Sequence, residues 1–200
     1  MNLTIVSGSH RLNSQSLKIS NYLKEKTLEL NLFDKITIID LAQENIPFWD
    51  MGVWKEAVIW KENWHPIEAI LTASNGFIFV TPEWGGMATP KLKNFFLLCT
   101  SKSIGHKPAL IVSVSSELAG SFPVSELRAS SYKNNKVCYI PDHLIIRNCK
   151  EVLNDASDSV VEESEKELRA RIDFTLNTLR EYSKVFQHLH IDLEKYPYGM

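Results

Sequence analysis

The sequence has few cysteines, little net charge and no long apolar run. The three cysteines are odd in number and fit no metal-binding or disulfide spacing, so we expect reduced thiols in a cytoplasmic protein. The net charge is −2, and the lysines and arginines are scattered, which argues against nucleic acid or an anionic membrane as a partner. Without a basic head and a following apolar stretch we expect no signal peptide, and no run is long enough to cross a bilayer.

The remaining composition is that of an ordinary globular protein. Hydrophobic residues make up 44% of the 200 residues and charged residues 23%, which is sufficient for one domain with a sizeable core. No internal repeat, low-complexity stretch or linker divides the chain. We therefore predict a single domain over residues 1–190 and a C-terminal tail over residues 191–200.

Short apolar runs alternate with helical patterns along the chain. Strand character occurs at 3–7, 35–40, 76–80, 109–114 and 136–140, with 144–146 as a further piece of the fifth strand. Helical spacing occurs after residue 16 and at 54–72, 89–100, 123–132 and 160–189. Alternation of this kind predicts an α/β fold of three layers, α/β/α, with a five-stranded parallel sheet of order 2-1-3-4-5.

In that order, ligands bind where the strand order reverses, at the carboxyl ends of the first and third strands. Three loops meet there, at residues 8–16, 81–89 and 115–121. The sequence therefore predicts one ligand site at this edge of the sheet.

The first loop, Gly8 to Ser16, connects a strand to a helix and is rich in hydroxyls. Backbone N–H groups at the start of a helix favour an anion, hydroxyls can donate to phosphate oxygens, and an arginine can hold two of them. We therefore expect a phosphate here, with these residues around it: Ser9, Arg11, Ser14, Gln15 and Ser16. The alternative is that serine and asparagine only cap the helix.

The loop does not match the common nucleotide motifs. It has no Gly-Lys-Ser/Thr and no G-x-G-x-x-G, which argues against a nucleoside triphosphate and against a dinucleotide held in the usual way. A mononucleotide fits better, with its ring across the other two loops.

The second loop suits a flat ring. Gly85 and Gly86 have no side chains, so their backbone can approach a ligand closely, and Trp84 offers an aromatic wall. The alternative is a plain turn beside a core tryptophan. In the third loop, Ser115, Ser116 and Gly120 would cover the far edge of the ring, although this loop alone indicates only a turn.

Two motifs in order carry a resemblance to a known family. Ser7-Gly8-Ser9-x-Arg11-x-x-Ser14-x-Ser16, followed by Thr81-Pro82-Glu83-Trp84 and then Leu92-Lys93-Asn94, resembles the NADPH-dependent FMN reductase family, from Leu3 to about Arg147. The resemblance implies a flavodoxin-like fold. It also implies that Ser9, Arg11, Ser14 and Ser16 bind the phosphate of FMN, and that the isoalloxazine is held by Pro82, Glu83, Trp84 and Gly85.

The second motif departs from the family pattern. Trp84 stands for the usual tyrosine, Gly85 for an asparagine and Met87 for a polar residue. Side-chain hydrogen bonds to the ring would be lost, each worth about 0.5–1.5 kcal/mol, so flavin affinity would be lower.

The resemblance implies an FMN-dependent oxidoreductase. Hydride would pass from NADPH or NADH through bound FMN to a small acceptor: a quinone, an azo compound, free flavin or a metal ion. We assign no catalytic side chain, because the flavin carries the chemistry, and no metal site, because His188 and His190 lack a third ligand. The alternative is a non-catalytic flavodoxin-like binding or scaffold protein with a degenerate flavin site.

Four tryptophans, Trp49, Trp54, Trp60 and Trp64, crowd the region before the third strand. If several are exposed, they form an apolar patch of the kind that subunit interfaces use. The resemblance also implies an oligomer, so we expect a homodimer or homotetramer, with the C-terminal tail as a segment that a partner subunit could receive.

Overall fold

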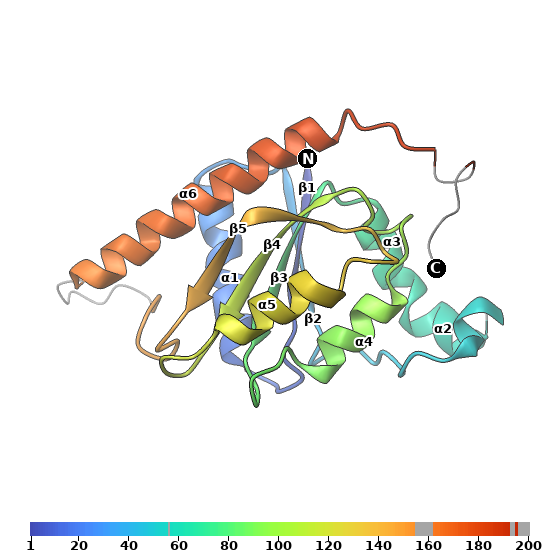
Figure 1. Ribbon diagram of the computed structural model, residues 1–200, viewed down its shortest axis with the longest axis horizontal. Coiled ribbons are helices and arrows are strands. Elements are labelled where there is room, and N and C mark those ends of the chain that lie inside the picture. Colours follow the sequence, from blue (N-terminus) through green and yellow to red (C-terminus); the bar gives the residue numbers. More distant parts are fainter. Residues whose placement is uncertain (56, 155–161, 193–194, 196–200) are drawn as a thin grey trace.

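A parallel sheet of five strands lies between two layers of helices (Figure 1). The computed structural model describes residues 1–55, 57–154, 162–192 and 195. The strand order is β2-β1-β3-β4-β5, as predicted. The strands are β1 (Asn2–Ser7), β2 (Lys35–Asp40), β3 (Gly76–Pro82), β4 (Pro108–Val114) and β5 (Cys138–Ile146).

The helices cover both faces of the sheet because the strands are apolar on both sides. Along β3, Phe77 and Phe79 belong to one core cluster, and Ile78 and Val80 belong to the other. The first cluster packs under α2, α3, α4 and α5, and the second under α1 and α6. The helices are α1 (Gln15–Glu29), α2 (Val58–Asn63), α3 (His65–Thr72), α4 (Pro90–Leu98), α5 (Ser121–Ser130) and α6 (Glu163–Phe186), with a 3₁₀ turn, η1 (Met51–Lys55).

The single helix expected over 54–72 is wrong. The structure has η1, α2 and α3 there, and α2 gives way to α3 at Trp64. Pro66 has no N–H to donate to the carbonyl four residues earlier, which interrupts one continuous helix, but this loss is tolerated in the first turn of α3. The break lies at Trp64, whose φ is −115°, and Trp60 and Trp64 are both buried in the core.

The fifth strand is one continuous element and not two pieces. It runs through Pro141, and its register with β4 shifts between the partners of Ala109 and Ile111, which are Tyr139 and His143. Proline cannot donate to a ladder and is confined to edge strands and bulges. β5 is an edge strand of the sheet, so the bulge accommodates Pro141 there.

The C-terminal helix is shorter than the expected 160–189. α6 spans Glu163–Phe186, and residues 160–161 lie outside the described residues, as does most of the predicted tail. Over the described ranges, no helix has both the length and the apolar character that crossing a bilayer requires.

Candidate functional site

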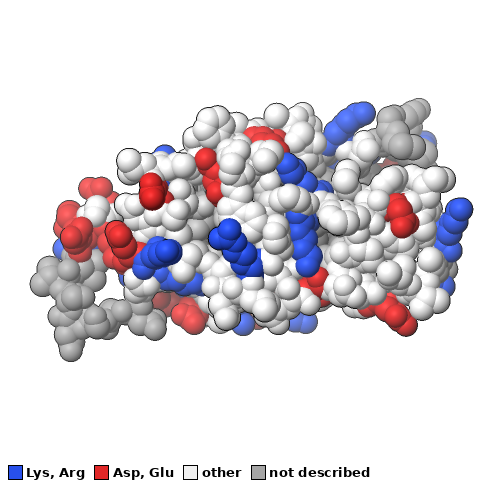
Figure 2. Space-filling model, turned by 90° about the horizontal axis from the view of Figure 1, so that it is seen from below, with Lys and Arg blue, Asp and Glu red and all other residues white. Residues whose placement is uncertain are grey.

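The carboxyl ends of β1, β3 and β4 open into a cavity of about 380 Å³, within the usual range for a small-ligand site. Figure 2 looks onto this end of the molecule and shows basic and acidic side chains interspersed there. Nine of the predicted site residues line the cavity: Ser9, Arg11, Ser14, Gln15, Ser16, Pro82, Glu83, Trp84 and Ser116. The switch point of the sheet therefore brings together residues from all three predicted loops.

Gly8 holds the first loop in place through two hydrogen bonds of its own backbone. The N–H of Gly8 donates to the carbonyl of Val80 at 2.7 Å, and its carbonyl accepts a hydrogen bond from the Thr89 hydroxyl at the start of α4. A Cβ at position 8 would lie 2.8 Å from the Val80 oxygen. Only glycine permits this approach, so it fixes the first loop against β3 and α4.

The start of α1 combines a helix cap with groups that have no hydrogen-bond partner within the described part of the chain. Ser14 caps the helix, since its Oγ accepts from the Leu17 N–H at 3.1 Å. The N–H groups of Gln15 and Ser16 come before the first intrahelical bond. Ser16 is 1% exposed, and its Oγ, like the Oε1 of Gln15, has no hydrogen-bond partner among the described residues.

A buried hydroxyl without a partner is rare and requires an explanation. Ser16 lines the cavity at the positive end of the helix dipole, so an anionic ligand would supply the missing partner. The capping alternative is therefore correct for Ser14. The cap does not engage the Ser16 hydroxyl, so a phosphate can still bind there. These residues fit the phosphate group of FMN.

The first and second loops meet through an aromatic stack. The guanidinium of Arg11 lies 4.5 Å from the centre of the Trp84 ring, and the His10 ring meets the same indole edge-on at 4.5 Å. The Ser9 hydroxyl accepts from the Arg11 N–H at 3.1 Å and shapes the loop beneath the stack. Arg11 was expected at the phosphate; the structure places its guanidinium over Trp84, inside the same cavity lining.

Gly85 and Gly86 form a turn and do not line the cavity. Trp84 and Met87 exchange two backbone hydrogen bonds, at 3.0 and 3.1 Å, and both glycines have positive φ, +57° and +74°. This is the geometry of a two-residue hairpin of type I′, which glycine adopts without strain. The turn alternative thus describes this pair, and Trp84 is the member of the second loop that presents an aromatic surface.

The second and third loops are tied together by Glu83. Its carboxylate accepts a hydrogen bond from the Gly120 N–H at 2.7 Å, and its own N–H donates to Val114. Ser115 is buried, and its Oγ accepts from the Glu117 N–H. Ser115 and Gly120 therefore shape the third loop, and of the three predicted residues there Ser116 lines the cavity.

Five lining residues were not predicted: Leu12, Asn13, Val114, Cys149 and Lys150. Asn13 has φ +51°, a left-handed conformation that asparagine tolerates. Cys149 and Lys150 follow β5, and burial raises the pKa of the Cys149 thiol. The carboxyl end of a parallel strand lies at the ligand edge of the sheet, so a lysine four residues after β5 was a usable signal.

The comparisons agree with this architecture. The sequence profile described as NADPH-dependent FMN reductase matches residues 1–151. A search among curated proteins gives no significant match.

Solved structures of similar fold have low sequence identity. The flavoenzyme NAD(P)H:(acceptor) oxidoreductase FerB from Paracoccus denitrificans has a TM-score of 0.73 and 16% identity, covering 92% of this chain and 98% of its own. An FMN-dependent NADH-azoreductase from Bacillus anthracis, solved in complex with FMN, has a TM-score of 0.61 and 15% identity, covering 90% of this chain and 100% of its own. An NAD(P)H:quinone oxidoreductase from Methanothermobacter marburgensis has a TM-score of 0.61 and 13% identity, covering 90% of this chain and 98% of its own. At these identities the likeness shows the flavodoxin-like fold.

Proposed function

The chain belongs to the NADPH-dependent FMN reductase family, and from this we propose that it transfers hydride from NADPH or NADH, through bound FMN, to a small acceptor. The acceptor classes are those of the resemblance: a quinone, an azo compound, free flavin or a metal ion. The observation that carries the proposal is the unpartnered, buried hydroxyl of Ser16 at the start of α1, in the same cavity as Trp84.

Each loop has a distinct part in this proposal. The Gln15 and Ser16 N–H groups and the Ser16 hydroxyl receive phosphate oxygens, and Arg11 contributes positive charge. Trp84 forms one wall for the ring, and Glu83 keeps the third loop in place through Gly120. Bound FMN supplies the hydride chemistry. We assign no catalytic side chain, and the carboxylate of Glu83 is already engaged by a backbone N–H.

We expect the purified protein to bind FMN and to turn over NADPH or NADH. Incubated with FMN and desalted, it should be yellow, and it should lose its visible flavin absorbance when NADPH is added without oxygen. The same measurement with free FMN at equal concentration is the control, because it gives the rate without the protein. A protein that stays colourless after incubation with FMN supports the scaffold alternative instead.

The acceptor is identified by a second measurement on the reduced protein. A panel of one quinone, one azo dye, free riboflavin and a ferric chelate is added anaerobically, and the rate at which flavin absorbance returns is followed. The fastest acceptor defines the class, and NADPH and NADH are compared by their rates of bleaching.

We also propose that the chain forms a homodimer or homotetramer in the cytoplasm. All three cysteines carry free thiols, in agreement with a reducing compartment. An apolar surface lies over residues 48–55 and 57–59, where Phe48 is 79% exposed and Trp54 65% exposed, joined by Met51, Val58 and Ile59. Exposed apolar side chains that are grouped in this way are typical of subunit interfaces.

The oligomer is tested by light scattering at about 50 μM, a concentration at which micromolar association is nearly complete. We expect a multiple of the monomer mass for the wild-type protein, and a shift toward the monomer for Trp54→Glu, since a buried charge is costly. Val185→Glu, which changes an exposed valine on α6, is the matched control and should leave the mass unchanged. A wild-type monomer at this concentration contradicts the proposal.

A further inference from the structure

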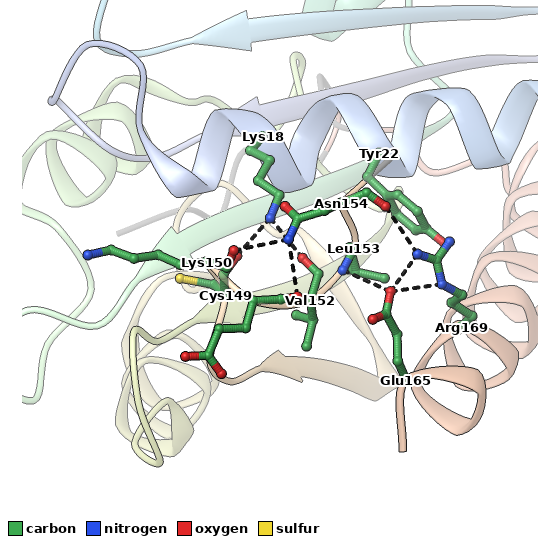
Figure 3. A network of polar contacts seen from close by, with 10 residues as sticks. Lys18, Tyr22, Cys149, Lys150, Val152, Leu153, Asn154, Glu165 and Arg169 are labelled. Carbon is green, nitrogen blue, oxygen red and sulfur yellow. Dashed lines mark hydrogen bonds and ion pairs between the residues drawn. The ribbon is translucent and has the colours of Figure 1, made fainter. Parts of the chain in front are cut away.

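The segment that follows β5, residues 147–154, reaches across to the start of α1. Lys18, in the first turn of α1, donates from its ammonium to the carbonyls of Cys149 at 2.9 Å and Val152 at 2.7 Å (Figure 3). On the other side, the Cys149 N–H donates to the carbonyl of Ser115 at 3.1 Å. The segment is therefore held between α1 and the third loop.

A second group of contacts fixes the far end of this segment. The Leu153 N–H donates to Glu165 at 3.1 Å, and Arg169 donates to the same carboxylate oxygen at 3.0 Å and to the Tyr22 hydroxyl at 3.3 Å (Figure 3). Leu153 is buried with φ +54°, which is unusual for a branched side chain. Such a conformation persists where surrounding contacts determine it, so residues 149–153 have one shape.

This shape presents Lys150 to the cavity. Lys150 lines the cavity together with Ser14, Gln15 and Ser16, and in Figure 3 its side chain extends away from the network, in the direction of the N-terminal end of α1. Within the described ranges, its ammonium forms no hydrogen bond or ion pair, and Lys150 is exposed. A cation so placed, beside a helix N-terminus with an unpartnered hydroxyl, is complementary to an anion.

Two other cations near the cavity, Lys18 and Arg11, already have partners in the chain. The Lys18 ammonium is occupied by two carbonyls, and burial lowers its pKa. The Arg11 guanidinium lies over the Trp84 ring. A phosphate monoester carries between one and two negative charges near pH 7, so one arginine shared with an indole leaves charge to be compensated.

We propose that Lys150 is a second cation for the phosphate of FMN, and that Lys18 is the positioning residue that holds the Lys150 segment. The proposal rests on the proposed function. It extends the phosphate site beyond the first loop to a segment more than 130 residues away along the chain, held there by the Lys18 bonds to Cys149 and Val152.

The test compares two flavins that differ by the phosphate. FMN and riboflavin are titrated with the protein, and binding is followed by flavin fluorescence. We expect Lys150→Ala to weaken FMN binding about tenfold, the loss of one charge-assisted hydrogen bond, and to leave riboflavin binding unchanged. Lys35→Ala is the matched control: it removes an exposed lysine at the start of β2, the opposite end of the sheet, and should change neither affinity.

Lys18→Met separates positioning from direct binding. If Lys18 acts through the segment, Lys18→Met should weaken FMN binding about as much as Lys150→Ala, and the double variant should lose little more than either one. Independent, additive losses would overturn the positioning role. Thermal melting of each variant verifies that the fold is retained.

The outcomes distinguish this proposal from the proposed function. FMN binding that is equal in Lys150→Ala and Lys35→Ala, or a loss in Lys150→Ala that is the same for FMN and riboflavin, overturns the role of Lys150 while the enzyme assignment stands. A wild-type protein that binds neither flavin overturns the proposed function, and this proposal with it.

Discussion

Gly120→Ala is expected to lower the free energy of unfolding by about 3 kcal/mol, the sum of backbone strain and a steric clash. Gly120 has φ +115° at the start of α5, a conformation that residues with a Cβ rarely adopt. The added Cβ would lie 2.5 Å from Ile145 Cγ2 on β5. Relief of this clash moves the Gly120 N–H away from the Glu83 carboxylate, so the second and third loops lose their link.

Gly86→Ala is the matched control for this prediction. Gly86 also has positive φ, +74°, but a Cβ there meets no atom within 4 Å, so the cost is only that of left-handed backbone, about 1 kcal/mol. Urea unfolding followed by circular dichroism measures both, and the melting temperature of Gly120→Ala should fall by roughly 6–12 °C at this chain length. Equal stability of the two variants would show that the third loop adapts without strain.

Arg11→Ala is expected to weaken FMN binding about 30-fold, which corresponds to roughly 2 kcal/mol for a charged, planar donor. Riboflavin binding should fall by no more than about fivefold, because riboflavin lacks the phosphate and loses only the stacking of Arg11 on Trp84, worth about 0.5–1 kcal/mol at an exposed site. Fluorescence titration of both flavins measures the difference.

Two further variants serve as a conservative substitution and as a control for Arg11→Ala. Arg11→Lys retains the charge but not the planar guanidinium, so we expect an intermediate loss. Arg180→Ala, on α6 and outside the cavity lining, removes one positive charge and should have no effect. Unchanged FMN binding in Arg11→Ala would remove this residue from the phosphate site.

The sheet could be predicted from the sequence because each strand is a short apolar run between turns, and because alternation with helices leaves few arrangements. The positions of the three loops followed from the strand order alone, and nine candidate residues do line the cavity. The prediction of the strands uses the periodicity of apolar residues, and the prediction of the loop positions uses the order of strands and helices; both can be read directly from the sequence.

Other features could not be predicted because one residue type serves two purposes. Glycine permits both a close approach to a ring and a tight turn, and Gly85 and Gly86 use the second. Serine can either cap a helix or bind phosphate; Ser14 caps α1, and phosphate binding is the role that we propose for the unpartnered Ser16 hydroxyl. The place of Lys150 just after β5 was a usable signal that it lies near the ligand edge, but its exact position depends on Lys18 and Glu165, residues remote from it along the chain.

The C-terminal helix α6 has a consequence for how the protein is made. Ile172, Leu176 and Leu179 of α6 are fully buried in the same cluster as Leu110 and Val112 of β4. On the ribosome, all five strands emerge before this cover does, and at about 5–20 residues per second the uncovered face persists for seconds. A nascent chain of this protein therefore offers chaperones an apolar surface until translation has passed α6, and a fragment ending near residue 151 is expected to aggregate.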